Sequence, residues 1–157
     1  MAKPSRYPQL ARCFFVTSST WEGRALFQSE QMAKLFVEVL FHYRNEHHYL
    51  LHEFVLLPDH FHLLVTLDSA VTVERAIQLV KGGYSFRVGK KLGFKGEVWQ
   101  RGFADHRIRD GHDFETHRSY ICENPVKRGL ARSPEKYPYC SAYPGFELDL
   151  PPANLRG

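Results

Sequence analysis

Two histidines one residue apart form the first group that could do chemistry, within the run PDHFHLLV from Pro58 to Val65. If this run is a β-strand, His60 and His62 point to one face and Phe61 to the other, because side chains alternate along a strand. Two imidazoles on one face can bind a single metal ion. Many such pairs merely occupy a solvated sheet face, and the pair taken alone favours that structural alternative.

A second group lies in the run SYICENPVKRGL, Ser119 to Leu130. Tyr120 and Asn124 are four residues apart, so on a helix they share one face, with His117 on the preceding turn. A phenol and an amide displayed together, away from the apolar side of the helix, need a reason. The structural alternative is that Tyr120 packs half-buried and that Asn124 caps a helix stopped by the following proline, and the spacing alone favours this alternative.

Positive charge is concentrated in one part of the chain. The sequence has 21 Lys and Arg against 17 Asp and Glu, a net charge of +4. The segment from Arg75 to Arg109 carries +7 by itself, which leaves −3 for the remainder. Such a concentration indicates a polyanion such as nucleic acid, although most charge runs are only solvated helix faces. Within the segment from Arg75 to Arg109, the candidate DNA-contacting residues are Lys81, Arg87, Lys90, Lys91, Lys95, Arg101 and, for base stacking, Trp99.

The elements that must position these groups follow from periodicity and breakers. The patterns predict strands at 12–18, 49–57, 61–67 and 103–109, and helices at 29–46, from 72 to about 89–93, and 110–124. Ser29 and Asp110 can cap the first and last of these helices. The βαββαβ order of the first six elements is the ferredoxin-like split βαβ sandwich, an α+β fold. The last helix is additional and carries Tyr120, and about residues 144–157 form an irregular tail. A chain of 157 residues fits one domain.

Composition excludes several classes of protein. No apolar run approaches the roughly 18 residues that a transmembrane helix needs. Lys3 and Arg6 are not followed by the apolar run of a signal peptide. Three widely spaced cysteines, Cys13, Cys122 and Cys140, suggest neither a disulfide framework nor a zinc ribbon. The sequence therefore predicts a cytoplasmic protein without a membrane segment.

A His-hydrophobic-His strand followed by a helical tyrosine with a polar residue four positions on resembles the single-tyrosine HUH transposases. Within that group, PDHFHLLV, WQRGF, DHRIRD and NPVKRGL are similar to the REP-associated tyrosine transposases of bacteria, and the similarity extends from the first strand to about Tyr143. The resemblance implies a ferredoxin-like nuclease domain that cuts single-stranded DNA beside a REP-like hairpin and can rejoin the ends. It also implies a monomer or homodimer in the bacterial cytoplasm, associated with the nucleoid.

The family's functional residues map onto both groups. His60 and His62 match the metal-binding histidines, Tyr120 the nucleophile and Asn124 the third protein ligand, where insertion-sequence relatives tend to carry Gln. The resemblance favours Mg²⁺ or Mn²⁺ as the working ion and a 5′-phosphotyrosine intermediate. A free tyrosine has a pKa of about 10, so removal of its proton needs assistance. Three alternatives remain open: a domesticated hairpin-binding protein, an HUH relaxase or replication-initiator nickase, and a metal hydrolase of another substrate.

Overall fold

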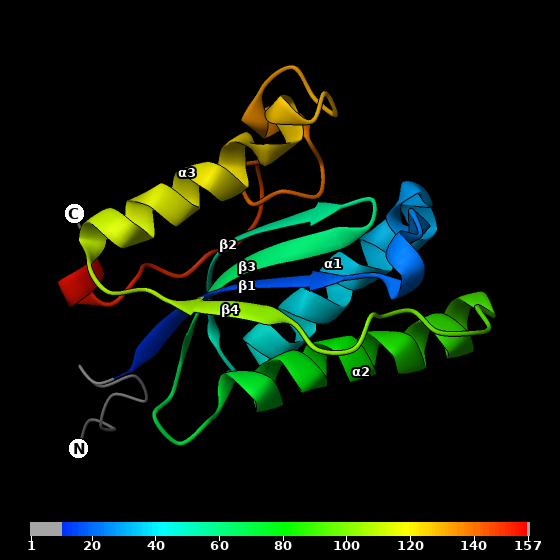
Figure 1. The fold of residues 1–157 in the computed structure, drawn as a ribbon, viewed down its shortest axis with the longest axis horizontal. Coiled ribbons are helices and arrows are strands. Elements are labelled where there is room, and N and C mark those ends of the chain that lie inside the picture. The colour runs from blue at the N-terminus through cyan, green and yellow to red at the C-terminus, as the bar shows by residue number, and fades with distance from the viewer. Residues whose placement is uncertain (1–10, 157) are drawn as a thin grey trace.

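Four antiparallel strands form one sheet in the order β2-β3-β1-β4 (Figure 1). The computed structural model describes residues 11–156, so the expectation drawn from Lys3 and Arg6 and the last residue of the predicted tail lie outside them. The strands are β1 (Arg12–Ser19), β2 (Leu50–Leu57), β3 (His60–Leu67) and β4 (Ala104–Arg107), and the α-helices are α1 (Glu30–Asn45), α2 (Val73–Leu92) and α3 (Gly111–Lys127). This order and topology confirm the predicted ferredoxin-like sandwich with an added helix.

The sheet is covered on both faces, which explains why β2 and β3 are buried along almost their whole length. Helices α1 and α2 lie on one face and α3 on the other (Figure 1). On β3, Phe61 and Leu63 pack in the core beneath α1 and α2, whereas Leu64 packs with Phe114 and Ile121 of α3. Alternation along this strand therefore sends even-numbered side chains toward α3.

The helices begin where capping residues allow them to begin. The side chains of Ser29, Thr72 and Asp110 accept hydrogen bonds from the first turns of α1, α2 and α3, as the sequence predicts for Ser29 and Asp110. α3 does not stop before Pro125, and that prediction is wrong: the helix continues to Lys127. Proline leaves the Ile121 carbonyl without its helical N–H partner. The Cys140 thiol lies 3.9 Å from that oxygen and partly replaces the lost donor.

The C-terminal segment is irregular, as predicted, but it does not lie loosely over the surface. It follows the outer edge of β2, where the Leu56 N–H donates to the Tyr139 carbonyl and the Ser141 N–H donates to the Phe54 carbonyl. Further along, the Asp149 carboxylate accepts from the Leu51 N–H. These bonds pair the N–H and C=O groups of an edge strand that would otherwise remain open.

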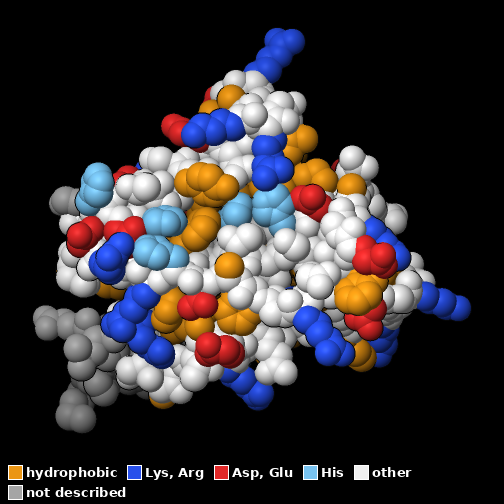
Figure 2. Space-filling model, viewed as in Figure 1, with side chains coloured by type: hydrophobic (Ala, Val, Ile, Leu, Met, Phe, Trp, Pro, Cys, Tyr) orange, Lys and Arg blue, Asp and Glu red, His pale blue; other side chains and the backbone are white. Residues whose placement is uncertain are grey.

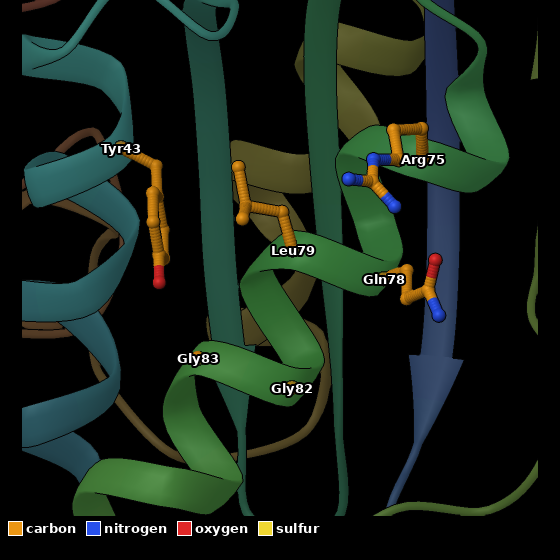
Figure 3. A pocket seen from close by; sticks show the side chains of 6 residues that line it. All are labelled: Tyr43, Arg75, Gln78, Leu79, Gly82 and Gly83. Atoms are coloured by element: carbon orange, nitrogen blue, oxygen red, sulfur yellow. The ribbon is translucent and has the colours of Figure 1, made fainter.

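Helices α1 and α2 approach each other closely at a glycine. The Tyr43 ring of α1 points toward Gly83 of α2, beside a shallow cavity that Gly82, Leu79 and Arg75 also line (Figure 3). A Cβ atom at position 83 would lie 2.7 Å from Cε2 and 2.8 Å from Cζ of Tyr43, closer than real carbon contacts allow. A Cβ at position 82 would meet nothing within 4 Å.

These two adjacent glycines give a matched test of the helix packing. We expect Gly82→Ala to raise the free energy of unfolding by up to about 1 kcal/mol, because alanine is the better helix former. Gly83→Ala should lower it by roughly 1 to 3 kcal/mol, because the new methyl group must displace the Tyr43 ring. Chemical denaturation of both variants measures the difference, and equal effects of the two substitutions would contradict the close approach.

Among the described residues, no helix combines the length and the apolar character needed to cross a membrane.

Candidate active site

The histidine pair and the helical tyrosine, sixty residues apart in the chain, meet between the sheet and α3. His60 and His62 lie on the α3 side of β3, and their ring centroids are 4.9 Å apart. The Tyr120 ring of α3 packs edge-on against His62 at 5.3 Å and against Phe15 of β1 at 5.9 Å. Tyr120 is still 43% exposed. Its ring is therefore held in place while a ligand can approach it.

Each histidine is oriented by a hydrogen bond to its Nδ1 atom. His60 Nδ1 lies 2.6 Å from the Asp59 carboxylate, which fixes the proton on Nδ1 and leaves Nε2 with a lone pair. His62 Nδ1 lies 2.7 Å from the hydroxyl of Thr17, its cross-strand partner on β1. With its proton on Nδ1, donated to Thr17, His62 also presents the Nε2 lone pair.

The Nε2 atom of His62 is the buried polar atom that the described residues leave without a hydrogen-bond partner. Burial, together with the charges of His60 and Arg128, lowers the pKa of His62 to about 3, so its ring is neutral at physiological pH. A buried neutral nitrogen without a partner is costly unless a ligand satisfies it. A divalent cation can accept this lone pair, so these residues fit a metal ion of the kind that the resemblance implies.

Asn124 lies one helical turn beyond Tyr120 on the same side of α3 and is 4% exposed. Its Oδ1 atom accepts a hydrogen bond of 2.9 Å from Nε of Arg128. One lone pair of this oxygen is therefore already used, and a cationic guanidinium stands beside the site. Asn124 Oδ1 keeps one further acceptor position, and Arg128 adds a group suited to a phosphate.

The lysines and arginines that the sequence suggests for DNA contact fall into two sets. The ammonium of Lys81 donates to the carbonyls of Gln100 and Gly102, and the guanidinium of Arg87 donates to the Tyr43 hydroxyl and the Gly83 carbonyl. These two therefore help hold the fold. The second set is exposed and free to meet phosphates: Lys90, Lys91, Lys95 and Arg101.

Trp99 does not offer the stacking surface that its glycine-flanked loop predicts. The ring is 8% exposed and packs among Phe27, Phe36 and Tyr84 in the core, with its N–H donating to the Lys81 carbonyl. The physical reason is an isolated bridge between Trp99 and Thr20, which draws the loop onto the end of β1. Phe86, 67% exposed, is instead the open aromatic ring of this region, with Lys90 over its face.

The loop at 95–102 reaches the histidine pair through β1. The Gln100 N–H donates to the Ser19 carbonyl, and Ser19 pairs with His60 across the sheet. Gln100, at the end of this loop, is thus one strand away from His60, whereas Lys90 and Lys91 lie on α2, which covers the opposite face of the sheet. Figure 2 shows histidine and hydrophobic side chains gathered over the centre and left of one face, with lysine and arginine side chains around them.

Three residues at this site escape sequence reasoning. Asp59 stands next to His60 and could have been noticed as its partner, and Arg128 lies within the run NPVKRGL. Thr17 carries no sequence signal, because its contact with His62 depends on the register between β1 and β3.

A ferredoxin-like sheet whose His-hydrophobic-His strand faces a helical tyrosine defines the class of the single-tyrosine HUH transposases. Comparison with known families agrees, since the model described as "Transposase IS200 like" matches residues 15–124, more than half of the chain. The chain belongs to the IS200-like transposase family. The match begins on β1 at Phe15 and ends at Asn124, so it contains both groups that form the site.

Two curated relatives are REP-associated tyrosine transposases, which confirms the resemblance. A putative one from Haemophilus influenzae is 32% identical over 112 residues, covering 65% of this chain and 64% of the relative. One from Escherichia coli is 28% identical over 104 residues, covering 66% of this chain and 60% of the relative. The matches thus span less than two thirds of either relative.

Two solved structures share the fold. The structure of a REP-associated tyrosine transposase bound to a REP hairpin superposes with a TM-score of 0.67 at 24% identity and covers 90% of this chain and 82% of its own. A putative transposase from Deinococcus radiodurans superposes with a TM-score of 0.52 at 15% identity, and the match covers 78% of this chain and 97% of that chain. At these identities the likeness concerns the fold.

Proposed function

We propose that this protein is a metal-dependent endonuclease and strand transferase that cuts single-stranded DNA beside a REP-like hairpin through a 5′-phosphotyrosine intermediate on Tyr120. The observation that carries the proposal is the exposed Tyr120 phenol packed against His62, whose Nε2 atom is buried and has no partner. The family and its REP-associated relatives support the DNA substrate.

The chemistry is a transesterification at phosphorus. The Tyr120 oxygen attacks the scissile phosphate, a bond forms between that oxygen and phosphorus, and the bond from phosphorus to the 3′ oxygen breaks. The phenolic proton passes to water, and the leaving oxygen takes up a proton from water to become a 3′ hydroxyl. Attack of another 3′ hydroxyl on the phosphotyrosine reverses the step and joins DNA without ATP.

The Nε2 atoms of His60 and His62 would hold a divalent ion, with Asn124 able to add its amide oxygen. When bound, Mg²⁺ or Mn²⁺ would supply charge neutralisation and orientation of the phosphate. Asp59 and Thr17 would hold the two rings in place through their Nδ1 atoms, and a proton on each Nδ1 would leave the Nε2 lone pair for the ion. Arg128 adds a fixed positive charge beside Asn124.

A hairpin-binding protein without catalysis is the main competing function. Such a protein would have no use for a neutral buried histidine and an exposed tyrosine in contact, and this contact favours the enzyme. The direct test is to incubate the protein with Mn²⁺ and a single-stranded oligonucleotide that contains a REP-like hairpin, labelled on the 3′ side of the cut. The proposal expects a covalent protein–DNA adduct on a denaturing gel, whereas the binding module gives none.

The hydroxyl of Thr17 should matter for metal affinity although it does not touch the metal. In Thr17→Val the shape is kept, but Nδ1 of His62 loses its partner and the ring loses its fixed tautomer. We expect Mn²⁺ to bind about 10- to 100-fold more weakly. Calorimetric titration measures the affinity, with Thr116→Val on the exposed side of α3 as the matched control. Equal Mn²⁺ affinity in the two variants would show that the Thr17 hydroxyl does not contribute to metal binding.

The exposed lysines of α2 should contribute to DNA binding through phosphates. Each phosphate contact adds about 0.7 to the slope of log affinity against log salt for single strands, so Lys90→Ala combined with Lys91→Ala should reduce the slope by roughly 1.4. Hairpin binding measured over a salt series gives this slope. Lys34→Ala on α1, whose lysine pairs with Glu30, should leave it unchanged. A slope that the double variant does not alter would place the DNA on another surface.

A further inference from the structure

A second group of metal-ligating side chains lies on the α3 face beside the histidine pair, with the Phe15 ring between the two groups. It consists of His106 on β4 together with Asp113 and His117 on the first two turns of α3. Each of the three residues offers one donor atom, and these three atoms lie within 4.8 Å of one another. We infer that His106, Asp113 and His117 form a binding site for a divalent transition-metal ion such as Zn²⁺.

The Asp113 carboxylate lies at ligand-like distances from both imidazoles. Nε2 of His106 lies 2.9 and 3.1 Å from the two carboxylate oxygens of Asp113, and Nδ1 of His117 lies 3.1 Å from Oδ1 of Asp113. Ligand atoms about 2.1 Å from a metal at tetrahedral or octahedral angles are separated by about 3.0 to 3.4 Å. An ion can therefore replace the protons that these nitrogens now share with the carboxylate. The rings of His106 and His117 stack at 4.7 Å with an angle of 22° between their planes, so they must turn for both lone pairs to point at the ion.

The donor set selects the kind of ion. Two imidazoles and one carboxylate suit Zn²⁺ and its neighbours in the first transition row, whereas Mg²⁺ prefers oxygen ligands and keeps its waters. Burial alone would raise the pKa of Asp113, but hydrogen bonds from the Arg109 N–H and His106, and the charges of His106 and His117, lower it below its usual value. The carboxylate is thus ionised and available as a ligand.

Two features of the surroundings must yield when an ion binds. The Nδ1 proton of His117 is also donated to the Asp113 carbonyl, which can spare it because a helical N–H already occupies that oxygen. The Arg109 guanidinium lies 4.0 Å from Asp113 and would repel a cation, but its side chain is 80% exposed and can turn into solvent. The side chains of the group are 16 to 38% exposed, which leaves an entry path and room for water ligands.

Such an ion would fasten the edge strand β4 to the helix that carries the nucleophile. Phe15 connects the two sites, since its ring packs against His117 at 4.7 Å, His62 at 5.2 Å and Tyr120 at 5.9 Å. The predicted role is structural: it fixes the start of α3 relative to the sheet, and Tyr120 follows His117 by less than one turn.

The test separates this site from the histidine pair by using the His62→Ala variant as background. Equilibrium dialysis should show that the His62→Ala protein binds one Zn²⁺ ion. Adding His106→Ala or Asp113→Asn to this background should weaken Zn²⁺ binding by at least about tenfold. His112→Ala, whose histidine lies on the same turn but outside the group, is the matched control and should retain the ion. Co²⁺ in the same background should give a visible absorption band that His106→Ala removes.

Mg²⁺ in place of Zn²⁺ should produce neither binding nor protection in the His62→Ala background. A rise in melting temperature with Zn²⁺ that disappears with His106→Ala would support the structural role. If the His62→Ala protein binds no Zn²⁺, or binds it equally with and without His106, the group is a hydrogen-bonded cluster and the inference fails. DNA cleavage in Mg²⁺ or Mn²⁺ would be unaffected by that outcome, so the proposed function stands or falls separately.

Discussion

Tyr120→Phe is expected to lower the rate of DNA cleavage by at least about a thousandfold, while hairpin binding and stability are retained. The substitution removes the phenolic oxygen that would become bonded to phosphorus, but it keeps the ring that packs against His62 and Phe15. Within residues 11–156, the Tyr120 hydroxyl makes no hydrogen bond that the fold would lose. Loss of cleavage would therefore report chemistry, and the adduct on a denaturing gel should vanish together with the cut product.

Other tyrosines provide the comparison. Tyr143 is exposed to a similar degree, 39% against 43%, so Tyr143→Phe should cut and form the adduct at the wild-type rate. Tyr84 is fully buried and donates its hydroxyl hydrogen to the Met32 carbonyl, which removes it as a competing nucleophile. Mass spectrometry of the linked peptide should identify Tyr120. Cleavage by Tyr120→Phe without any adduct would replace transesterification by hydrolysis.

The second large effect concerns the histidine pair. His60→Ala and His62→Ala should each reduce cleavage to the background level, because two nitrogen ligands on one strand leave too little to hold a divalent ion when either is lost. EDTA should do the same to the wild-type protein, and added Mn²⁺ should restore it. Cleavage that continues at the wild-type rate in EDTA would refute the metal role of both histidines.

Folding must be separated from metal binding in these variants. His62 is buried, so its truncation leaves a cavity and an unpaired Thr17 hydroxyl and should cost stability as well as activity. His60 is at the edge of the site and is less buried, which makes His60→Ala the cleaner variant. His42→Ala, from the exposed side of α1, should leave both melting temperature and cleavage unchanged.

The element order and much of the core could be predicted from the sequence. The apolar runs of β1 and β3 and the helical stripes of α1 and α2 are local patterns, and a βαββαβ order with short connections leaves few ways to bury them. The alternation of side chains along a strand predicted that His60 and His62 share a face opposite Phe61, which the position of Phe61 in the core confirms. Capping by Ser29 and Asp110 was equally visible, because it depends on one side chain and the next turn.

Tertiary structure alone decided what surrounds those groups. Trp99 became a core residue because the loop at 95–102 pairs with the end of β1, and α3 passed Pro125 because packing and a thiol offset the lost hydrogen bond. Thr17 reached His62, and His106 reached Asp113 and His117, through strand register and helix placement. Periodicity determines which face of an element a residue occupies, whereas contacts between elements depend on how their faces are brought together.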